Sequence, residues 1–148
     1  MNRLVVPNAI LLGEVKAMLS EGKDVVIPTK GNSMLPFIRG MRDSVRLRKL
    51  DTLAVGDIVL AELREGVYVL HRVFLLDGDK VTLKGDGNRH GFEHCMRRDI
   101  AGTAVAILKD GVKELDCRSP RALRRAAYWN RLKPFHRIIL GLYRRLFI

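Results

Sequence analysis

The sequence contains little cysteine and no long apolar run. Its 148 residues include two cysteines, Cys95 and Cys117, which form no CxxC pair. This pattern excludes a disulfide-dense secreted scaffold and favours a reducing compartment. No window of about 20 residues is free of charge, so we expect no transmembrane helix. Residues 13–16 interrupt the apolar N-terminus before a secretory signal can form, and the sequence therefore predicts a cytoplasmic protein.

Acidic residues are missing from the last part of the chain. Residues 118–148 contain nine Lys and Arg and no Asp or Glu, whereas residues 1–117 hold 18 basic and 16 acidic residues. The net charge of +11 therefore belongs mostly to a C-terminal tail. Such a tail suits an anionic partner: a membrane surface, a nucleic acid or an acidic protein face. We divide the chain into a domain of residues 1–117 and a basic tail of residues 118–148.

The domain has the pattern of a mainly β fold. An amphipathic helix is predicted at residues 8–19, and Gly22 follows it as a stop signal. Short β-type runs then alternate with turns rich in glycine. We expect strands at residues 25–27, 44–48, 58–60, 67–73, 80–83 and 100–108. The prediction is a compact body built mostly of strands with one leading helix. A polar loop is expected after the strand at 80–83.

The tail pattern is helical. Pro120 marks its start, a first helix is predicted at residues 121–133, and Pro134 interrupts it. A second, basic amphipathic helix is expected at residues 135–147. Its apolar face consists of Phe135, Ile138, Ile139, Leu142 and Leu146, and its basic residues are Arg137, Arg144 and Arg145. Such a helix is typical of binding to an anionic membrane surface, here the inner membrane face, although the apolar face could instead pack on the domain. Nucleic acid is a less suitable partner, because binding it requires no apolar stripe.

Three short segments carry the residue types of a serine peptidase. They are Gly-Asn-Ser-Met-Leu-Pro at residues 31–36, Val-Leu-His-Arg-Val at 69–73 and Lys-Gly-Asp-Gly-Asn at 84–88. A serine needs a base within hydrogen-bond reach to become nucleophilic, and the base works best when a third group orients it. Ser33, His71 and Asp86 could supply these three roles. Taken singly, each has a plainer interpretation: a turn serine, a core histidine and a turn aspartate.

The three segments together resemble the signal peptidase and LexA-type peptidase superfamily. The resemblance runs from about residue 25 to about residue 105 and includes Val-Gly-Asp-Ile-Val at residues 55–59. It implies a β-rich signal-peptidase/LexA-like fold in which Ser33 lies at the mouth of a groove that binds an extended peptide. Because histidine stands where many members have lysine, the chain is most similar to the histidine-type signal peptidases of archaea and the endoplasmic reticulum. Unlike those enzymes, it has only about 30 residues before Ser33, and they do not form a transmembrane anchor.

The resemblance also implies roles for individual residues. Ser33 would be the nucleophile, His71 the general base and Asp86 the group that orients His71. Asp79 competes for the third role, although it has the sequence of a turn residue. Lys84 is an alternative base, with a solvated charge at a strand end as its plainer interpretation. Where bacterial-type members carry a hydroxyl two residues before the nucleophile, this chain has Gly31. The oxyanion would then be bound by the backbone N–H of Ser33 and the side chain of Asn32.

A metal site is a weaker alternative. His90, His94, Cys95 and Asp99 are ligand types, but no second Cys or His cluster accompanies them. We therefore expect neither a metal nor an organic cofactor. The sequence predicts a serine endopeptidase that cleaves an extended peptide segment. The alternatives are a non-catalytic peptide-binding module of the same fold and a protein whose tail binds membrane or nucleic acid.

Overall fold

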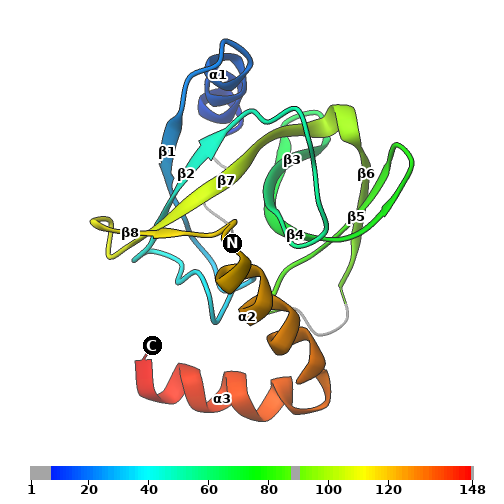
Figure 1. Ribbon diagram of the computed structural model, residues 1–148. Coiled ribbons are helices and arrows are strands. Elements are labelled where there is room, and N and C mark those ends of the chain that lie inside the picture. The colour runs from blue at the N-terminus through cyan, green and yellow to red at the C-terminus, as the bar shows by residue number, and fades with distance from the viewer. Residues whose placement is uncertain (1–7, 88–90, 148) are drawn as a thin grey trace.

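The computed structural model describes residues 8–87 and 91–147 and has a mainly β architecture (Figure 1). An eight-stranded antiparallel sheet is preceded by one helix and followed by two. The elements are α1 (Asn8–Ser20), β1 (Val25–Pro28), β2 (Ser44–Arg48), β3 (Ile58–Arg64), β4 (Val67–Asp77), β5 (Lys80–Lys84), β6 (Glu93–Met96), β7 (Ile100–Lys109), β8 (Lys113–Asp116), α2 (Pro120–Arg131) and α3 (His136–Phe147), with short 3-10 turns η1 (Arg97–Asp99) and η2 (Lys133–Phe135).

The strands are ordered β1-β2-β7-β3-β4-β5-β6, and β8 also pairs with β7. Thr103 of β7 pairs with Arg48 of β2 on one side and with Val59 of β3 on the other. The long strand β7 therefore joins two parts of the sheet. In the second part, β3 to β6 curl until β6 contacts β3, which gives a small barrel-like unit.

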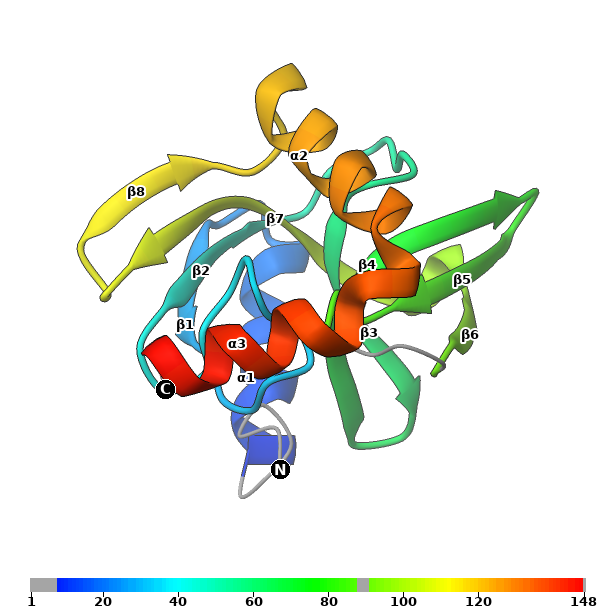
Figure 2. The same cartoon turned by 90° about the horizontal axis from the view of Figure 1, so that it is seen from below.

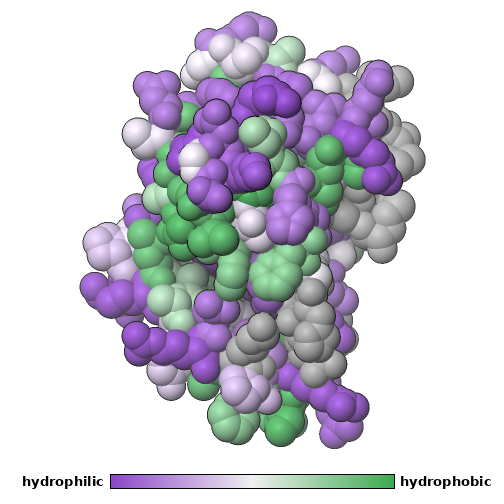
Figure 3. Space-filling view, turned by 90° about the vertical axis from the view of Figure 1, so that its right-hand side faces the viewer, coloured by the Kyte–Doolittle hydropathy of each residue, from purple (hydrophilic) through white to green (hydrophobic). Residues whose placement is uncertain are grey.

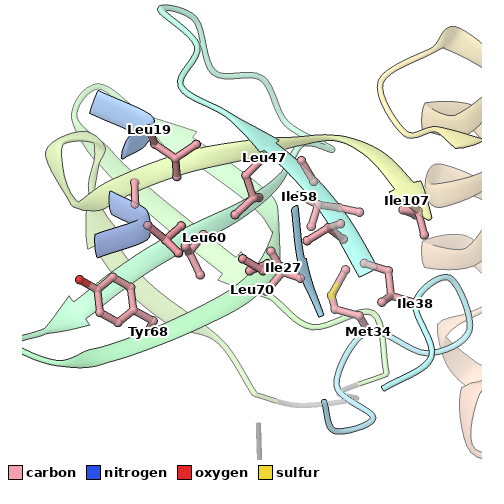
Figure 4. Packing of buried hydrophobic residues seen from close by; sticks show 14 of the residues in the cluster. Leu19, Ile27, Met34, Ile38, Leu47, Ile58, Leu60, Tyr68, Leu70 and Ile107 are labelled. Atoms are coloured by element: carbon pink, nitrogen blue, oxygen red, sulfur yellow. The ribbon is translucent and has the colours of Figure 1, made fainter. Parts of the chain in front are cut away.

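Two apolar clusters fill these two parts. The larger one lies between α1 and the strands, and Figure 4 shows its side chains converging from both (Figure 4). Helix α1 approaches β7 closely at Gly102, where an added Cβ would lie 2.9 Å from Leu19. The smaller cluster fills the inside of the barrel-like unit. Its buried members are Val59, Ala61, Val73, Val81, Leu83, Cys95 and Ile100.

Cross-strand pairing separates the side chains of β4 into two faces. Tyr68 and Leu70 belong to the larger cluster, whereas Val69 and Val73 pack with the barrel cluster. Successive residues of a strand point to opposite faces. His71 therefore shares the barrel face with Val73, and Arg72 shares the opposite face with Leu70.

Most predicted elements are confirmed, and one prediction is wrong. The leading helix and all six predicted strands are present at or close to the expected positions. The expected polar loop after β5, by contrast, contains strand β6. Pairing of Val81 with Cys95 holds β6 against β5 and places the Cys95 side chain in the barrel cluster. His94 faces the opposite side, where its ring contacts the Thr82 hydroxyl. His90 lies outside the described residues.

The basic tail forms the two expected helices and packs against the domain (Figure 2). Ser119 caps α2 by accepting a hydrogen bond from Ala122 N at 3.1 Å, and Pro120 occupies the first turn. A third apolar cluster joins Leu35 of the domain to Trp129 and Leu140 of the tail. Within the described residues, no helix is both long and apolar enough to cross a membrane.

The apolar face predicted for the second tail helix is partly wrong. Ile139 packs with the third cluster, although it was expected on the open face. Phe135 belongs to η2 and precedes the helix. The other predicted apolar residues are exposed: Phe135, Ile138, Leu142 and Leu146. The helix thus turns one apolar face to the domain and leaves a second one open.

Candidate active site

Ser33 lies in the loop of residues 29–43, between β1 and β2, and the two ends of this loop are fastened together. The Thr29 hydroxyl donates to the Asp43 carbonyl at 2.7 Å, and Met41 N donates to the Thr29 carbonyl at 2.8 Å. Inside the loop, Gly31 has a φ of +88°, and a Cβ at Gly40 would lie 2.0 Å from the Gly31 carbonyl oxygen. Glycine at position 31 is therefore required by the backbone of this loop.

A buried charge cluster supports the same loop from below. The Asp43 carboxylate is fully buried and accepts hydrogen bonds from Arg39 Nη2 at 2.9 Å, Lys109 Nζ at 2.8 Å and the backbone N–H of Asp110 at 3.0 Å. Burial by itself raises the pKa of Asp43, but the hydrogen bonds from Arg39 and Lys109 outweigh it and hold the pKa well below its usual range. The loop is thus fixed to β2 and β7 by charged groups as well as by its backbone.

The predicted glycine-rich segment after β5 contacts the Ser33 loop directly. Gly87 N donates to the Ser33 carbonyl at 2.8 Å, and a Cβ at Gly87 would lie 2.6 Å from the Asn32 carbonyl oxygen. Only glycine allows this approach. Two of the three motifs recognised in the sequence therefore meet in space, although more than 50 residues separate them in the chain.

His71 lies on β4 and pairs with a carboxylate that the sequence analysis did not select. Its ring Nδ1 contacts Glu93 Oε1, from the first residue of β6. The His71 side chain is only 6% exposed and that of Glu93 is 22% exposed. An ionised carboxylate can only accept, so Nδ1 must carry the proton and Nε2 is then the unprotonated nitrogen. This is the tautomer that a general base needs.

The predicted pairing of His71 with Asp86 is wrong, because Asp86 is bound to Arg72. Arg72 Nη2 lies 2.7 Å from Asp86 Oδ2, and Arg72 Nε lies 2.8 Å from Oδ1. Arg72 points to the opposite face of β4 from His71, so its partner cannot also reach the imidazole. Burial lowers the pKa of Arg72, but the charge of Asp86 and the hydrogen bonds to it outweigh burial and raise the pKa. Arg72 therefore stays charged, and charge attraction adds to the hydrogen bonds of the pair.

Further contacts hold the Arg72–Asp86 pair in place. Arg72 Nη1 donates to the Gly56 carbonyl at 2.8 Å, and its guanidinium lies 5.3 Å from the centre of the Phe37 ring. The indole N–H of Trp129 donates to the Asp86 carbonyl at 2.8 Å. The pair therefore links the barrel, the Ser33 loop and the tail. A cavity of about 260 Å³ lies beside it, between β4 and α2.

The remaining candidate residues lie outside the contact between His71 and Glu93. Asp79 is exposed in the turn between β4 and β5, and its carbonyl accepts a hydrogen bond from Arg97 N at 2.9 Å. The interpretation of Asp79 as a turn residue is therefore confirmed. Lys84 ends β5 and is 5% exposed, which corrects the solvated charge expected there. Asn32 is exposed beside Ser33. Asp99 accepts a hydrogen bond from Met96 N at 2.8 Å and so shapes the end of β6.

Ser33 lies beside Leu70, the neighbour of His71 on β4, and is not joined to His71. Ser33 and Leu70 line the same recess, whose volume is about 10 Å³. Leu70 is the neighbour of His71 on β4, and Arg72 pairs with Lys84, three residues before the Gly87 that binds Ser33. The Ser33 loop therefore contacts β4 at Leu70, whose side chain points to the opposite face of the strand from that of His71. Among the hydrogen bonds of the described residues there is none between the Ser33 hydroxyl and His71, so the predicted contact is not made in this structure.

An exposed apolar area lies on the barrel side of the molecule (Figure 3). Phe74 and Phe92 contribute to it, with ring centres 5.1 Å apart in an edge-to-face arrangement. Phe74 also lines the cavity beside the Arg72–Asp86 pair, and Phe92 directly precedes Glu93. The two phenylalanines thus form one exposed apolar patch beside the cavity.

Glu93 is the residue that sequence reasoning missed. It lies seven residues beyond Asp86, in a segment with few apolar residues that gave no strand signal. Its role depends on the pairing of Leu83 with Glu93, which puts the carboxylate on the same face as Leu83 and His71. Compared with known proteins, the chain matches no family model, and no curated protein is similar to it at a significant level.

Proposed function

We propose that the protein is a serine peptidase in which Ser33 is the nucleophile, His71 the general base and Glu93 the residue that orients His71. The observation that carries the proposal is the contact of His71 Nδ1 with Glu93 Oε1. It provides a buried imidazole whose Nδ1 is paired with a carboxylate, on the strand whose neighbouring residue, Leu70, lines the recess beside Ser33. A buried ring N–H needs an acceptor in any case, and a carboxylate is the acceptor that also stabilises the protonated imidazole.

In the proposed reaction, His71 Nε2 takes the proton of the Ser33 hydroxyl while Ser33 Oγ attacks the scissile carbonyl. The protonated His71, stabilised by Glu93, then donates to the leaving amine. Water, deprotonated by the same histidine, hydrolyses the acyl-enzyme and restores Ser33. Catalytic hydrogen bonds are often long before substrate binds. We therefore expect the substrate to bring the Ser33 hydroxyl and His71 Nε2 together.

The proposed substrate is an extended peptide segment with a small side chain next to the cut. The recess beside Ser33 has about the volume that a single water molecule needs, so it suits a side chain no larger than a methyl group. The antiparallel fold, with its leading helix and its glycine-rich segment against the Ser33 loop, is compatible with the signal-peptidase/LexA-like fold suggested by the motifs. The backbone N–H of Ser33 and the exposed Asn32 side chain are the proposed oxyanion donors.

The test is reaction of the full chain with a fluorophosphonate probe, followed by intact mass and peptide mapping. One adduct on Ser33 is expected, with none on Ser33→Ala and strongly slowed labelling of His71→Ala. The midpoint of denaturant unfolding should be close to that of the wild type for both variants. Lost labelling can then be assigned to lost reactivity and not to unfolding.

A non-catalytic peptide-binding module is the second candidate. The missing hydrogen bond between Ser33 and His71 favours it. In that case the folded wild-type protein would give no adduct and would hydrolyse no peptide of the expected kind, yet it would still bind an extended peptide with a small residue. That combination of results would replace the peptidase proposal.

A further inference from the structure

Helix α3 and the turn before it present an apolar surface that the described part of the chain leaves open. Phe135, Ile138, Leu142 and Leu146 are 55%, 63%, 52% and 72% exposed. With 100° between successive residues of a helix, the three that belong to α3 occupy one arc of about 80°, and Phe135 directly precedes the helix. We call these four side chains the open face. Exposed large apolar residues grouped in this way mark an interaction site more often than a random surface.

The neighbouring arc of the same helix is occupied by the domain. His136 and Leu140 are buried, and Ile139 and Tyr143 pack with the third cluster. The His136 ring stacks on Trp129 with centres 4.0 Å apart and planes 5° apart, and its Nε2 lies 2.6 Å from the Trp129 carbonyl. The helix is therefore held in one orientation, and it cannot turn its open face inward without breaking these contacts. Figure 2 shows α3 lying across the lower side of the molecule (Figure 2).

The charge around the open face has one sign. Of the nine basic residues in 118–148, Arg118 pairs with Asp57 at 2.8 Å. The exposed arginines of the two helices form no ion pair with any described acidic side chain: Arg121, Arg124, Arg125, Arg131, Arg137, Arg144 and Arg145. Exposed Tyr128 lies among those of α2. The surface is thus apolar in one strip and strongly cationic beside it.

We propose that this surface binds an anionic lipid bilayer, with α3 lying flat in the headgroup region. The open face would enter the acyl boundary, and the arginines would contact lipid phosphates. A second copy of the chain is a poorer occupant, because two faces with this charge repel each other. A nucleic acid would use the arginines but leave the apolar strip exposed to water. The proposal does not depend on peptidase activity.

The arrangement would also bring the candidate site to the membrane. Leu35 of the Ser33 loop contacts the inner arc of the tail through the third cluster. A helix with its side chains is about 10 Å across and the two arcs are adjacent, so the Ser33 loop would lie within about one helix diameter of the lipid surface. Membrane-borne peptides would then be the substrates within reach.

The first experiment is flotation of the full chain with vesicles of phosphatidylglycerol and phosphatidylcholine, and with vesicles of phosphatidylcholine alone. Binding to the anionic vesicles and at least tenfold weaker binding to the neutral ones are expected. Ile138→Glu should reduce anionic binding at least tenfold. The matched control is Val112→Glu, an exposed aliphatic in the turn between β7 and β8, 82% exposed, which should bind like wild type.

A second pair of variants tests the charges. Arg144→Gln with Arg145→Gln should weaken anionic binding several-fold, whereas Arg98→Gln with Lys113→Gln, which changes the net charge equally at exposed sites outside the tail, should change it less than twofold. The proposal is overturned if the wild type does not float, or if Ile138→Glu floats equally well. It is also overturned if Ile138→Glu abolishes self-association in lipid-free sedimentation, or if nucleic acid displaces the vesicles. Fluorophosphonate labelling of Ser33 in Ile138→Glu tests the peptidase proposal separately.

Discussion

Two neighbouring residues of β4 each pair with a carboxylate, and the two pairs differ in almost every respect. His71 faces the barrel cluster and contacts Glu93, whereas Arg72 faces the opposite way and binds Asp86 through two nitrogens. The first pair contains an imidazole, the side chain that most often acts as a general base. In the second pair the arginine is always charged. One strand therefore carries a group suited to proton transfer and a group suited to fixing the structure.

The comparison teaches that two segments predicted to meet can do so while the partners of their side chains differ from those predicted. The segment with Asp86 does meet the Ser33 loop, as the sequence suggested. Its carboxylate, however, serves Arg72, and the His71 partner comes from the next strand. If this division is right, the two carboxylates must give opposite results when each is replaced by its amide.

The largest effect is expected for Glu93→Gln on the rates of the proposed reaction. An amide at this place can hold the imidazole in the wrong tautomer, and it removes the negative charge that stabilises the imidazolium. The rate of fluorophosphonate labelling and of peptide hydrolysis should fall by roughly 10³ to 10⁴. The rates of His71→Ala should fall at least as far. The rates of the double variant should be no lower than those of His71→Ala, because the residues act as one unit. A loss of less than tenfold with Glu93→Gln would remove Glu93 from the mechanism.

The next effect is on stability and concerns Asp86→Asn. The change leaves the Arg72 guanidinium buried without its counter-charge, which should lower the free energy of unfolding by about 3–5 kcal/mol. Urea unfolding should show an earlier midpoint at an unchanged slope. Glu93→Gln is the matched amide replacement at a more exposed carboxylate. It should lower the free energy of unfolding by less than half as much. Equal losses for the two variants would mean that the pairs do not differ in the way described.

Much of the fold could be predicted from the sequence, because its signals are local. Alternating apolar residues and glycine-containing turns give the strands around β3, β4 and β5, and the spacing of leucine and isoleucine gives α3. Strand β6 gave no such signal, since Glu93 and His94 are polar and its pairing with β5 is set by the closure of the barrel-like unit. The partners of His71 and Arg72 could not be predicted from the sequence either. Which face of a strand a side chain takes depends on register, and register follows from long-range packing.

The third prediction concerns the buried charge cluster that supports the Ser33 loop, in which Asp43 pairs with Arg39 and Lys109. The pKa of Asp43 is held well below its usual range by Arg39 and Lys109, against the effect of burial. A group whose pKa is lower in the folded protein stabilises it above the unfolded pKa, which is about 3.9 for aspartate. That contribution is lost as the pH falls below about 4.

We expect Asp43→Asn to be less stable than wild type by roughly 3 kcal/mol at pH 7, and the difference to shrink as the pH is lowered from 4 toward 2. Urea midpoints at several pH values would measure it. A difference that stays constant down to pH 2 would show that Asp43 acts through packing and not through its charge.

The smallest effect tests whether the tail supports the fixed pair. Trp129 donates its indole N–H to the Asp86 carbonyl at 2.8 Å, in a buried position. Trp129→Phe removes this donor while keeping an aromatic ring against Leu35 and Leu140. The free energy of unfolding should fall by about 1 kcal/mol for the lost hydrogen bond, plus a similar amount for the smaller ring. For a chain of this length each kcal/mol lowers the melting temperature by roughly 3 °C.

The control for this variant is Tyr128→Phe, which changes the neighbouring aromatic residue at a site 64% exposed and should alter the melting temperature by less than about 2 °C. If the tail acts on the pair, Trp129→Phe should lose much of its effect in an Asp86→Asn background, because the two changes then weaken one connected network. Fully additive losses would contradict that coupling. They would leave the tail as a separate layer that covers the Ser33 loop without contributing to the Arg72–Asp86 pair.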